Sequence, residues 1–178
     1  MAQGMTIRAA TLDDAPGVAR VHVDTWRTTY RGLVSDSYLD SMNYVESAER
    51  WGRAFANPER RGFAFVAEDE TGAIVGFAVG GPQRSDVPGY DGELYAIYVL
   101  HDQQGKGLGR ALAQAVAREL LARGMSSMVV WVLTDNYPSR RFYESLGGVW
   151  LREQEFELDG LMLKETGYGW EDINNLAG

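Results

Sequence analysis

Between a strand-like segment and an amphipathic helix stands the stretch Gln104-Gly105-Lys106-Gly107-Leu108-Gly109-Arg110. Glycines at alternate positions let a backbone turn tightly and approach a ligand, and the N–H groups at a helix N-terminus point at an anion. Lys106 and Arg110 add positive charge. The stretch therefore predicts a cradle for a phosphate group, although a plain glycine-rich turn is an alternative that this segment alone leaves open.

The glycine spacing argues against two common nucleotide-binding motifs. Glycines at 105, 107 and 109 match neither G-x-x-x-x-G-K-[ST], the loop of ATP- and GTP-binding proteins, nor G-x-G-x-x-G, the dinucleotide motif. A nucleotide-dependent enzyme is therefore disfavoured.

The segments around this stretch predict a parallel pair of strands. The stretch from Glu93 to Leu100 is rich in aromatic and branched residues, which favours a strand, and the stretch from Gly107 to Arg123 has the apolar spacing of a helix. The run from Ser127 to Leu133 is continuously apolar, as in a strand buried on both faces. A strand, a helix and a second strand in this order require a parallel crossover.

The rest of the chain predicts one domain. A strand is expected at 6–9, followed by a helix from Asp13 to Tyr30 that a capping box of Thr11 and Asp14 opens. The next expected elements are one or two helices over 38–55, a hairpin of 63–68 and 74–80, a surface loop at 80–91 and a helix at 137–146. A last hairpin is expected from 149–158 and 161–170, with its turn at Asp159-Gly160. We expect a single α/β (α+β) domain over residues 1–178. It would have a mixed central sheet of about six to seven strands, helices on both faces and a C-terminal β-hairpin. Residues 1–5 are expected to be disordered.

Composition excludes several chemistries. The 178 residues include no cysteine and two histidines, which removes thiol catalysis and disfavours a metal site. The formal net charge of -8 argues against nucleic-acid and membrane partners, so a bound polyanion needs a local positive site. The sequence shows no signal segment and no apolar run long enough to span a membrane, and we expect a cytoplasmic protein.

Two motifs together resemble the GNAT superfamily of acetyl-CoA-dependent N-acetyltransferases. The first is Q-x-x-G-x-G, carried by Gln104, Gly107 and Gly109. The second, Asn136-x-x-Ser139-x-x-Phe142-Tyr143-Glu144-x-x-Gly147, is similar to the family's N-x-x-A-x-x-F-Y-E-x-x-G, with serine in place of the usual alanine. The resemblance implies a GNAT-like fold with splayed central strands, and homodimers are frequent in that family.

The resemblance also implies a site for acetyl-CoA, the acyl donor. The backbone of the strand before the cradle would bind the pantetheine arm, and the cradle would bind the pyrophosphate. The implied cofactor-binding residues are Ile97, Val99, Gln104, Gly105, Lys106, Gly107, Leu108, Gly109, Arg110, Asn136, Ser139 and Tyr143. Asn136 is also expected to cap its helix.

Aminolysis of a thioester needs a group that takes the amine's proton and one that protonates the departing thiolate. By resemblance, Tyr143 is predicted to be the general acid, with a core aromatic as the alternative. Glu93 matches a frequent position of the general base, acting directly or through a water molecule, with a solvated strand-end carboxylate as the alternative. The predicted reaction is direct acetyl transfer to a primary amine in a ternary complex. The alternative function is a catalytically inactive acyl-CoA-binding sensor or interaction module.

The acceptor side is predicted more coarsely, as a site for a small-molecule or peptide amine. Trp26, Tyr30, Tyr90, Asp91 and Glu93 are the candidate substrate-binding residues, and core packing is an equal alternative for Trp26 and Tyr30. The alternating glutamates at 153, 155 and 157 favour a solvated strand face.

Overall fold

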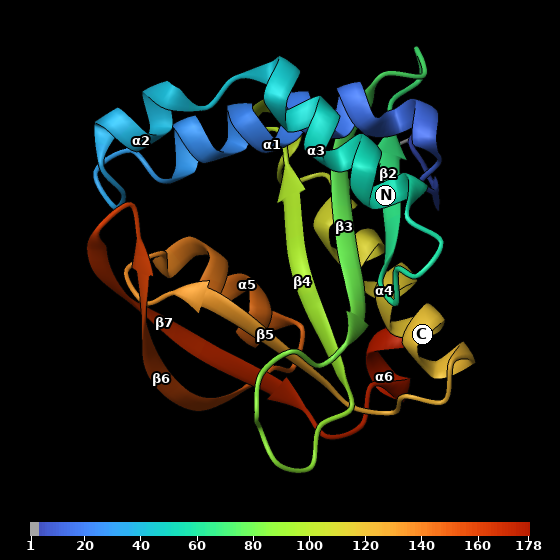
Figure 1. Ribbon diagram of the computed structural model, residues 1–178. Helices are drawn as coiled ribbons and strands as arrows, with labels where there is room; N and C mark the ends of the chain where they lie inside the picture. The colour runs from blue at the N-terminus through green and yellow to red at the C-terminus, as the bar shows by residue number, and fades with distance from the viewer. Residues whose placement is uncertain (1–3) are drawn as a thin grey trace.

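A seven-stranded sheet runs through the molecule in the order β1-β2-β3-β4-β5-β7-β6 (Figure 1). The computed structural model describes residues 4–178. The strands are β1 (Thr6–Ala9), β2 (Phe63–Glu68), β3 (Ile74–Pro82), β4 (Gly92–Val99), β5 (Met128–Leu133), β6 (Val149–Leu158) and β7 (Leu161–Trp170). All neighbours are antiparallel except β4 and β5, which are parallel. The predicted mixed sheet and C-terminal hairpin are confirmed.

The helices follow the predicted order, with small differences at their ends. They are α1 (Ala15–Thr29), α2 (Asp36–Ser41), α3 (Tyr44–Ala56), α4 (Leu108–Ala122), α5 (Tyr137–Ser145) and the unpredicted short α6 (Asn174–Ala177). The 3₁₀ turns are η1 (Leu12–Asp14) and η2 (His101–Gln103). The Thr11 N–H donates to Asp14 Oδ2 at 2.7 Å, so the predicted capping box is present, one turn before α1. The region 38–55 forms two helices because Asn43 caps α3, accepting from the Glu46 N–H at 2.9 Å.

Helices cover both faces of the sheet, as expected (Figure 1). On one face, Val18 and Val21 of α1 pack with Phe77 of β3, beside α3. On the other face, Leu112 and Val116 of α4 belong to the largest core cluster. The expected disorder of residues 1–5 stays a prediction: residues 1–3 lie outside the described part, and Met5 packs against this larger cluster. No helix within 4–178 is long and apolar enough to cross a membrane.

The two central strands separate soon after they meet. Strands β4 and β5 are paired only from Gly92 to Leu94, opposite Met128 to Val130. On the other side of β4, Val79 pairs with Ala96 but Gly80 pairs with Leu94, which leaves Tyr95 as the extra residue of a bulge. A bulge bends its strand and interrupts pairing. The splayed central strands implied by the resemblance are confirmed, and the gap between them opens a site.

His22 on α1 makes the fold sensitive to acid. Its ring lies edge-on to Trp51, whose Nε1 donates to Nδ1 at 3.4 Å, and burial lowers the pKa of His22 from 6.5 to about 4. The unfolded chain therefore takes up a proton between about pH 6.5 and 4 that the folded chain excludes, and the folded state loses stability as the pH falls.

We expect the free energy of unfolding to drop by about 2 kcal/mol from pH 7 to pH 5 because of His22. Urea unfolding of the wild type and of His22→Gln at both pH values measures this contribution. The variant should lose that much less than the wild type, and an equal loss in both proteins would show that His22 is not responsible.

Candidate active site

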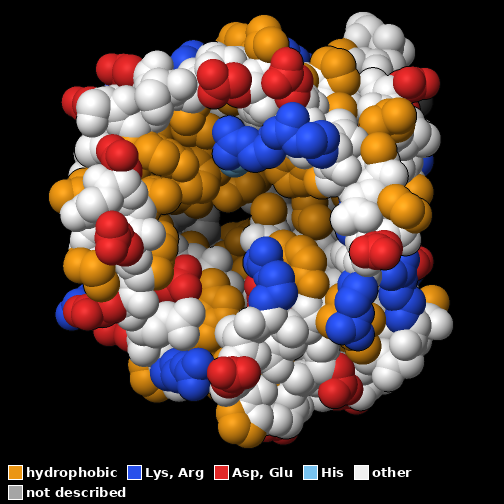
Figure 2. Space-filling model, viewed as in Figure 1, with side chains coloured by type: hydrophobic (Ala, Val, Ile, Leu, Met, Phe, Trp, Pro, Cys, Tyr) orange, Lys and Arg blue, Asp and Glu red, His pale blue; other side chains and the backbone are white. Residues whose placement is uncertain are grey.

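Two cavities meet in the gap between the splayed strands. One has a volume of about 550 Å³ and extends from α1 past β4 and β5 to β6 and β7. The other, of about 420 Å³, lies along the start of α4 and along α5. Figure 2 shows a hollow on this face of the molecule, with hydrophobic side chains around it. Five residues line both cavities: Ile97, Val99, Gln104, Ser139 and Tyr143.

The smaller cavity, called here the α4 groove, is shaped by the glycines of the predicted cradle. Gly105 and Gly107 have φ angles of +75° and +82°, a conformation that side-chain-bearing residues rarely adopt. Gly109 serves packing instead, because a Cβ there would lie 3.1 Å from the Phe142 ring. The N-cap residue of α4 is Gly107, which has no side chain to accept from the first N–H groups, so within residues 4–178 these groups remain free for a ligand. This arrangement suits a phosphate group.

Most of the predicted cofactor residues line the α4 groove. They are Ile97, Val99, Gln104, Gly105, Gly107, Leu108, Gly109, Arg110, Ser139 and Tyr143. Lys106 lines neither cavity; it is exposed, and its Nζ lies 2.8 Å from Gln103 Oε1. Asn136 lines the larger cavity and caps α5, accepting from the Ser139 N–H at 3.3 Å. The Gln104 side chain donates to the Val99 carbonyl at 3.1 Å, which ties the cradle to the end of β4.

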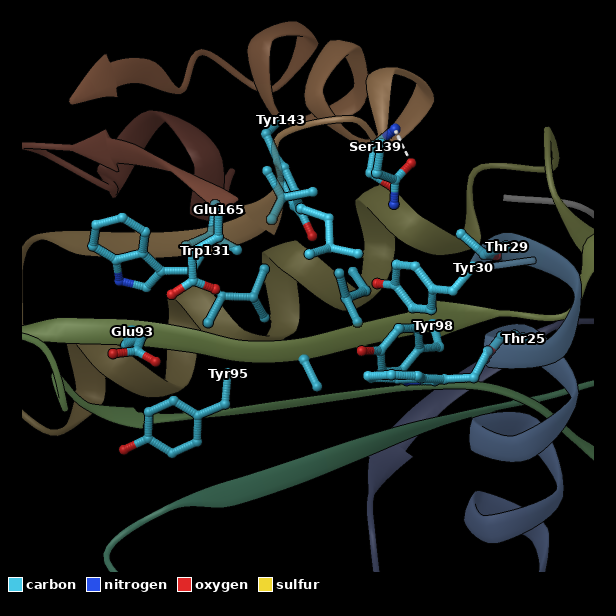
Figure 3. A pocket seen from close by; sticks show the side chains of 18 of the residues that line it. Thr25, Thr29, Tyr30, Glu93, Tyr95, Tyr98, Trp131, Ser139, Tyr143 and Glu165 are labelled. Atoms are coloured by element: carbon cyan, nitrogen blue, oxygen red, sulfur yellow. Dashed lines mark hydrogen bonds between the residues drawn. The ribbon is translucent and has the colours of Figure 1, made fainter. Parts of the chain in front are cut away.

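Tyr143 stands where the two cavities join. Its ring is only 6% exposed and packs near Phe142 and Trp170. Its hydroxyl points into the larger cavity (Figure 3) and has no hydrogen-bond partner among residues 4–178. Burial raises the pKa of Tyr143, with a smaller contribution from Tyr98. The phenol is therefore protonated at neutral pH and can donate its proton into the cavity.

Three aromatic side chains form the end of the larger cavity nearest α1. Trp26 and Tyr30, one turn apart, have ring centroids 4.6 Å apart, and Tyr98 of β4 lies close by (Figure 3). Trp26 and Tyr30 both line the cavity and also pack against the core, and their role in binding the amine stays a prediction. The Trp26 Nε1 is buried without a hydrogen-bond partner in the part of the chain described. Burial raises the pKa of Tyr30 and of Tyr98.

Glu93 lies at the opposite end of the larger cavity, and it is not the solvated carboxylate considered above. It is 3% exposed, and its two oxygens accept three hydrogen bonds from Arg84: the backbone N–H at 3.0 Å, Nε at 3.1 Å and Nη2 at 2.7 Å. The Arg84 guanidinium also stacks 3.7 Å above the Tyr95 ring centroid. The sequence reasoning missed Arg84, which is the partner that makes burial of Glu93 possible.

Tyr90 and Asp91 do not line the larger cavity, unlike Glu93. Two hydrogen bonds from Gln83 keep this part of the loop out of the cavity wall. The Gln83 Nε2 donates to the Tyr90 carbonyl at 2.6 Å, and the Gln83 N–H donates to the Asp91 carbonyl at 2.8 Å. The Tyr90 ring then packs over Gly169 of β7, where a Cβ would lie 2.7 Å from it. The loop places Arg84 and Ser85 in the cavity wall instead.

Further cavity residues come from the C-terminal half of the sheet. Trp131, Gln154 and Glu165 line the cavity together with Glu93, and Trp131 Nε1 donates to Ser85 Oγ at 3.0 Å. In Figure 3, Trp131, Glu165 and Glu93 gather at the end away from Tyr30. Within residues 4–178 no group of three or more histidines and acids is arranged to hold a metal ion, and the absence of a metal stays a prediction.

Comparison with known proteins identifies a matching family and several similar proteins. Residues 21–148 match the Acetyltransferase (GNAT) family. An uncharacterized N-acetyltransferase of Bacillus subtilis is 46% identical over 97% of this chain and 96% of its own. The L-methionine sulfoximine/L-methionine sulfone acetyltransferase of Pseudomonas aeruginosa is 30% identical over 88% of this chain and 83% of its own.

Solved structures share the fold. The PaiA N-acetyltransferase of Thermoplasma acidophilum, solved with coenzyme A, superposes with a TM-score of 0.70 at 18% identity, covering 93% of this chain and 98% of that one. YncA of Salmonella typhimurium, solved with acetyl-CoA, gives 0.60 at 25% identity over 94% of each chain. The resemblance read from the two motifs is confirmed, and nothing in the comparisons favours an inactive module. The chain belongs to the GNAT family of N-acetyltransferases.

Proposed function

We propose that this protein transfers the acetyl group of acetyl-CoA directly to a primary amine while both substrates are bound. One observation carries the proposal: the α4 groove and the larger cavity open onto each other at Tyr143. A donor in the groove and an acceptor in the cavity could then react without a covalent enzyme intermediate. The chain has no cysteine to form such an intermediate, which agrees with direct transfer.

The α4 groove suits the cofactor in both charge and backbone geometry. Free N–H groups at the start of α4, together with Arg110, offer a positive site for the pyrophosphate. The edge of β4 beyond Leu94, no longer paired with β5, offers backbone groups at Ile97 and Val99 to the amide-rich pantetheine arm. Acetyl-CoA, when bound, supplies the activated acetyl thioester.

Tyr143 would protonate the departing sulfur, because it is the phenol at the junction and its raised pKa keeps it protonated. The role of Glu93 as the base stays a prediction. Its carboxylate already accepts three hydrogen bonds from Arg84. Homodimer formation and a cytoplasmic location likewise stay predictions.

The acceptor is proposed to be a small amine of amino-acid size. A volume of about 550 Å³ is in the range of small-molecule sites. The end of the cavity with Arg84 and Glu165 carries both signs of charge, which suits a zwitterion. The Pseudomonas aeruginosa relative is named for L-methionine sulfoximine and L-methionine sulfone, which are amino-acid derivatives.

Thiol release from acetyl-CoA, measured across a panel of primary amines, tests the proposed function. The panel begins with L-methionine sulfoximine and L-methionine sulfone, continues through free amino acids and simple alkylamines, and includes a peptide with a free N-terminus. We expect acetylation of one or more small zwitterionic amines and little reaction with the peptide. Tight binding of CoA without turnover on any amine would contradict the proposal and support the inactive module.

A further inference from the structure

Three charged side chains line the larger cavity: Arg84, Glu93 and Glu165. Arg84 and Glu93 form an ion pair at 2.7 Å, in which the Arg84 side chain stays 61% exposed. Glu165 has no cationic side chain within ion-pair distance in the chain from 4 to 178. It is therefore the carboxylate of the cavity whose charge remains unpaired.

The register of the sheet directs Glu165 into the cavity. It lies on β7 between Leu133 of β5 and Gln154 of β6. Two residues along, on the same face of the strand, Gly167 leaves room for the Trp131 indole, since a Cβ there would lie 2.9 Å from the ring. Figure 3 shows Glu165 beside Trp131, on the wall that faces β4 and Glu93.

The surroundings of Glu165 favour proton uptake. The Gln154 Nε2 donates to one of its oxygens at 2.7 Å, and the other oxygen has no partner within the described residues. Burial raises the pKa of Glu165, and the facing charge of Glu93 adds to this, while the Gln154 bond and the Arg84 charge act in the opposite direction. Arg84 and Glu93 are the charged groups that face it from the neighbouring loop and from β4.

We propose that Glu165, rather than Glu93, takes the proton that the acceptor ammonium must lose before it attacks. The inference rests on the proposed function. Glu93 is poorly suited because both of its oxygens already accept bonds from Arg84, and a proton there would break the ion pair of a buried carboxylate. Glu165 attracts the ammonium through its unpaired charge and keeps a free oxygen for the proton. Glu93 instead positions Arg84.

Two residues, Glu165 and Tyr143, account for all proton transfers of the proposed acetyl transfer. One N–H bond of the ammonium breaks, and its proton forms an O–H bond on Glu165, directly or through one water molecule. The nitrogen lone pair then forms the C–N bond as the C–S bond breaks. Tyr143 gives its proton to the sulfur and regains one from the nitrogen, which leaves an amide and a free thiol. Glu165 returns its proton to solvent.

The test compares Glu165→Gln with Glu93→Gln in the full-length protein, using thiol release with L-methionine sulfone and with the fastest other amine of the panel. In the wild type, kcat/KM should rise with pH as Glu165 ionises, reach a plateau and fall once the amine itself is neutral. In Glu165→Gln it should be lower by about 100-fold or more at neutral pH. It should then rise steadily up to the amine's own pKa, because only amine already neutral in solution reacts.

Two further variants separate a chemical role from a structural one. Glu165→Asp should restore the plateau at a reduced rate, because it keeps a carboxylate. Glu155→Gln removes an exposed carboxylate of the same hairpin, outside both cavities, and should match the wild type. Glu93→Gln should raise KM through Arg84 but keep the plateau.

The outcomes also separate this inference from the proposed function. If Glu165→Gln keeps the wild-type profile with less than about a threefold loss, while Glu93→Gln loses the plateau, Glu93 is the base and the inference is wrong. If the wild-type protein acetylates no amine of the panel, the proposed function fails and the inference fails with it.

Discussion

Replacing Tyr143 with phenylalanine should lower kcat for acetyl transfer by about 10²- to 10⁴-fold, the usual contribution of a general acid. The free energy of unfolding should change by less than about 0.5 kcal/mol. The ring stays packed near Phe142 and Trp170, and the lost hydroxyl has no hydrogen-bond partner within residues 4–178. Thiol-release kinetics and urea unfolding measure the two effects.

Tyr168→Phe is the matched control. Its hydroxyl accepts from Arg140 Nε at 3.1 Å and donates to Glu144 Oε1 at 2.7 Å, but Tyr168 lines neither of the two cavities. This variant should lose about 1–3 kcal/mol of stability and keep most of its kcat. If Tyr143→Phe keeps wild-type kcat, Tyr143 is a packing residue and not the acid.

Gly107→Val should abolish cofactor binding. The branched side chain would stand at the N-terminus of α4, where the phosphate must approach the backbone. A loss of about 100-fold or more in CoA affinity is expected, equivalent to about 2.7 kcal/mol. The sequence alone suggests only a modest cost in stability, but the φ of +82° adds strain of about 1–2 kcal/mol for any residue with a Cβ.

Gly72→Val separates strain from blocked binding. Gly72 has the same φ of +82°, lies in the turn between β2 and β3, and lines neither cavity. It should lose a similar amount of stability and bind CoA normally. Calorimetric titration with CoA gives the comparison, and normal binding by Gly107→Val would show that the cradle does not hold the phosphate.

Local patterns predicted much of the fold and the backbone turn of the cradle. The apolar run from Ser127 to Leu133 predicted a strand buried on both faces, and successive residues Met128, Val129 and Val130 of β5 are buried. The glycines of the cradle have the positive φ angles that such spacing favours, at Gly105 and Gly107. The glutamates at 153, 155 and 157 are exposed, as their alternation predicted. Each of these features depends on residues close together in the sequence.

The acceptor end depends on contacts between distant segments, which no local pattern contains. Glu93 and Glu165 share a cavity because β7 is inserted between β5 and β6, and that strand order could not be derived from periodicity. Arg84 reaches Glu93 because Gln83 shapes the loop, and the same bonds turn Tyr90 away. Nothing in the sequence of this loop, which is rich in Gly, Pro and Ser, indicates that its arginine pairs with Glu93.

The separation of charge explains how an acidic chain can bind a polyanion. The net charge is -8, yet the α4 groove has free N–H groups and Arg110 in its wall. The unpaired carboxylate of Glu165 lies in the other cavity, which is the proposed site of the acceptor. Each substrate would thus meet the charge that attracts it.

A crystal structure with CoA tests most directly the claim that donor and acceptor meet at Tyr143. We expect the pyrophosphate on the N–H groups at the start of α4 and the sulfur within hydrogen-bond reach of the Tyr143 hydroxyl. CoA bound instead between α4 and β1, in a cavity that shares only Gly107 and Arg110 with the α4 groove, or with its sulfur turned away from Tyr143, would contradict this claim.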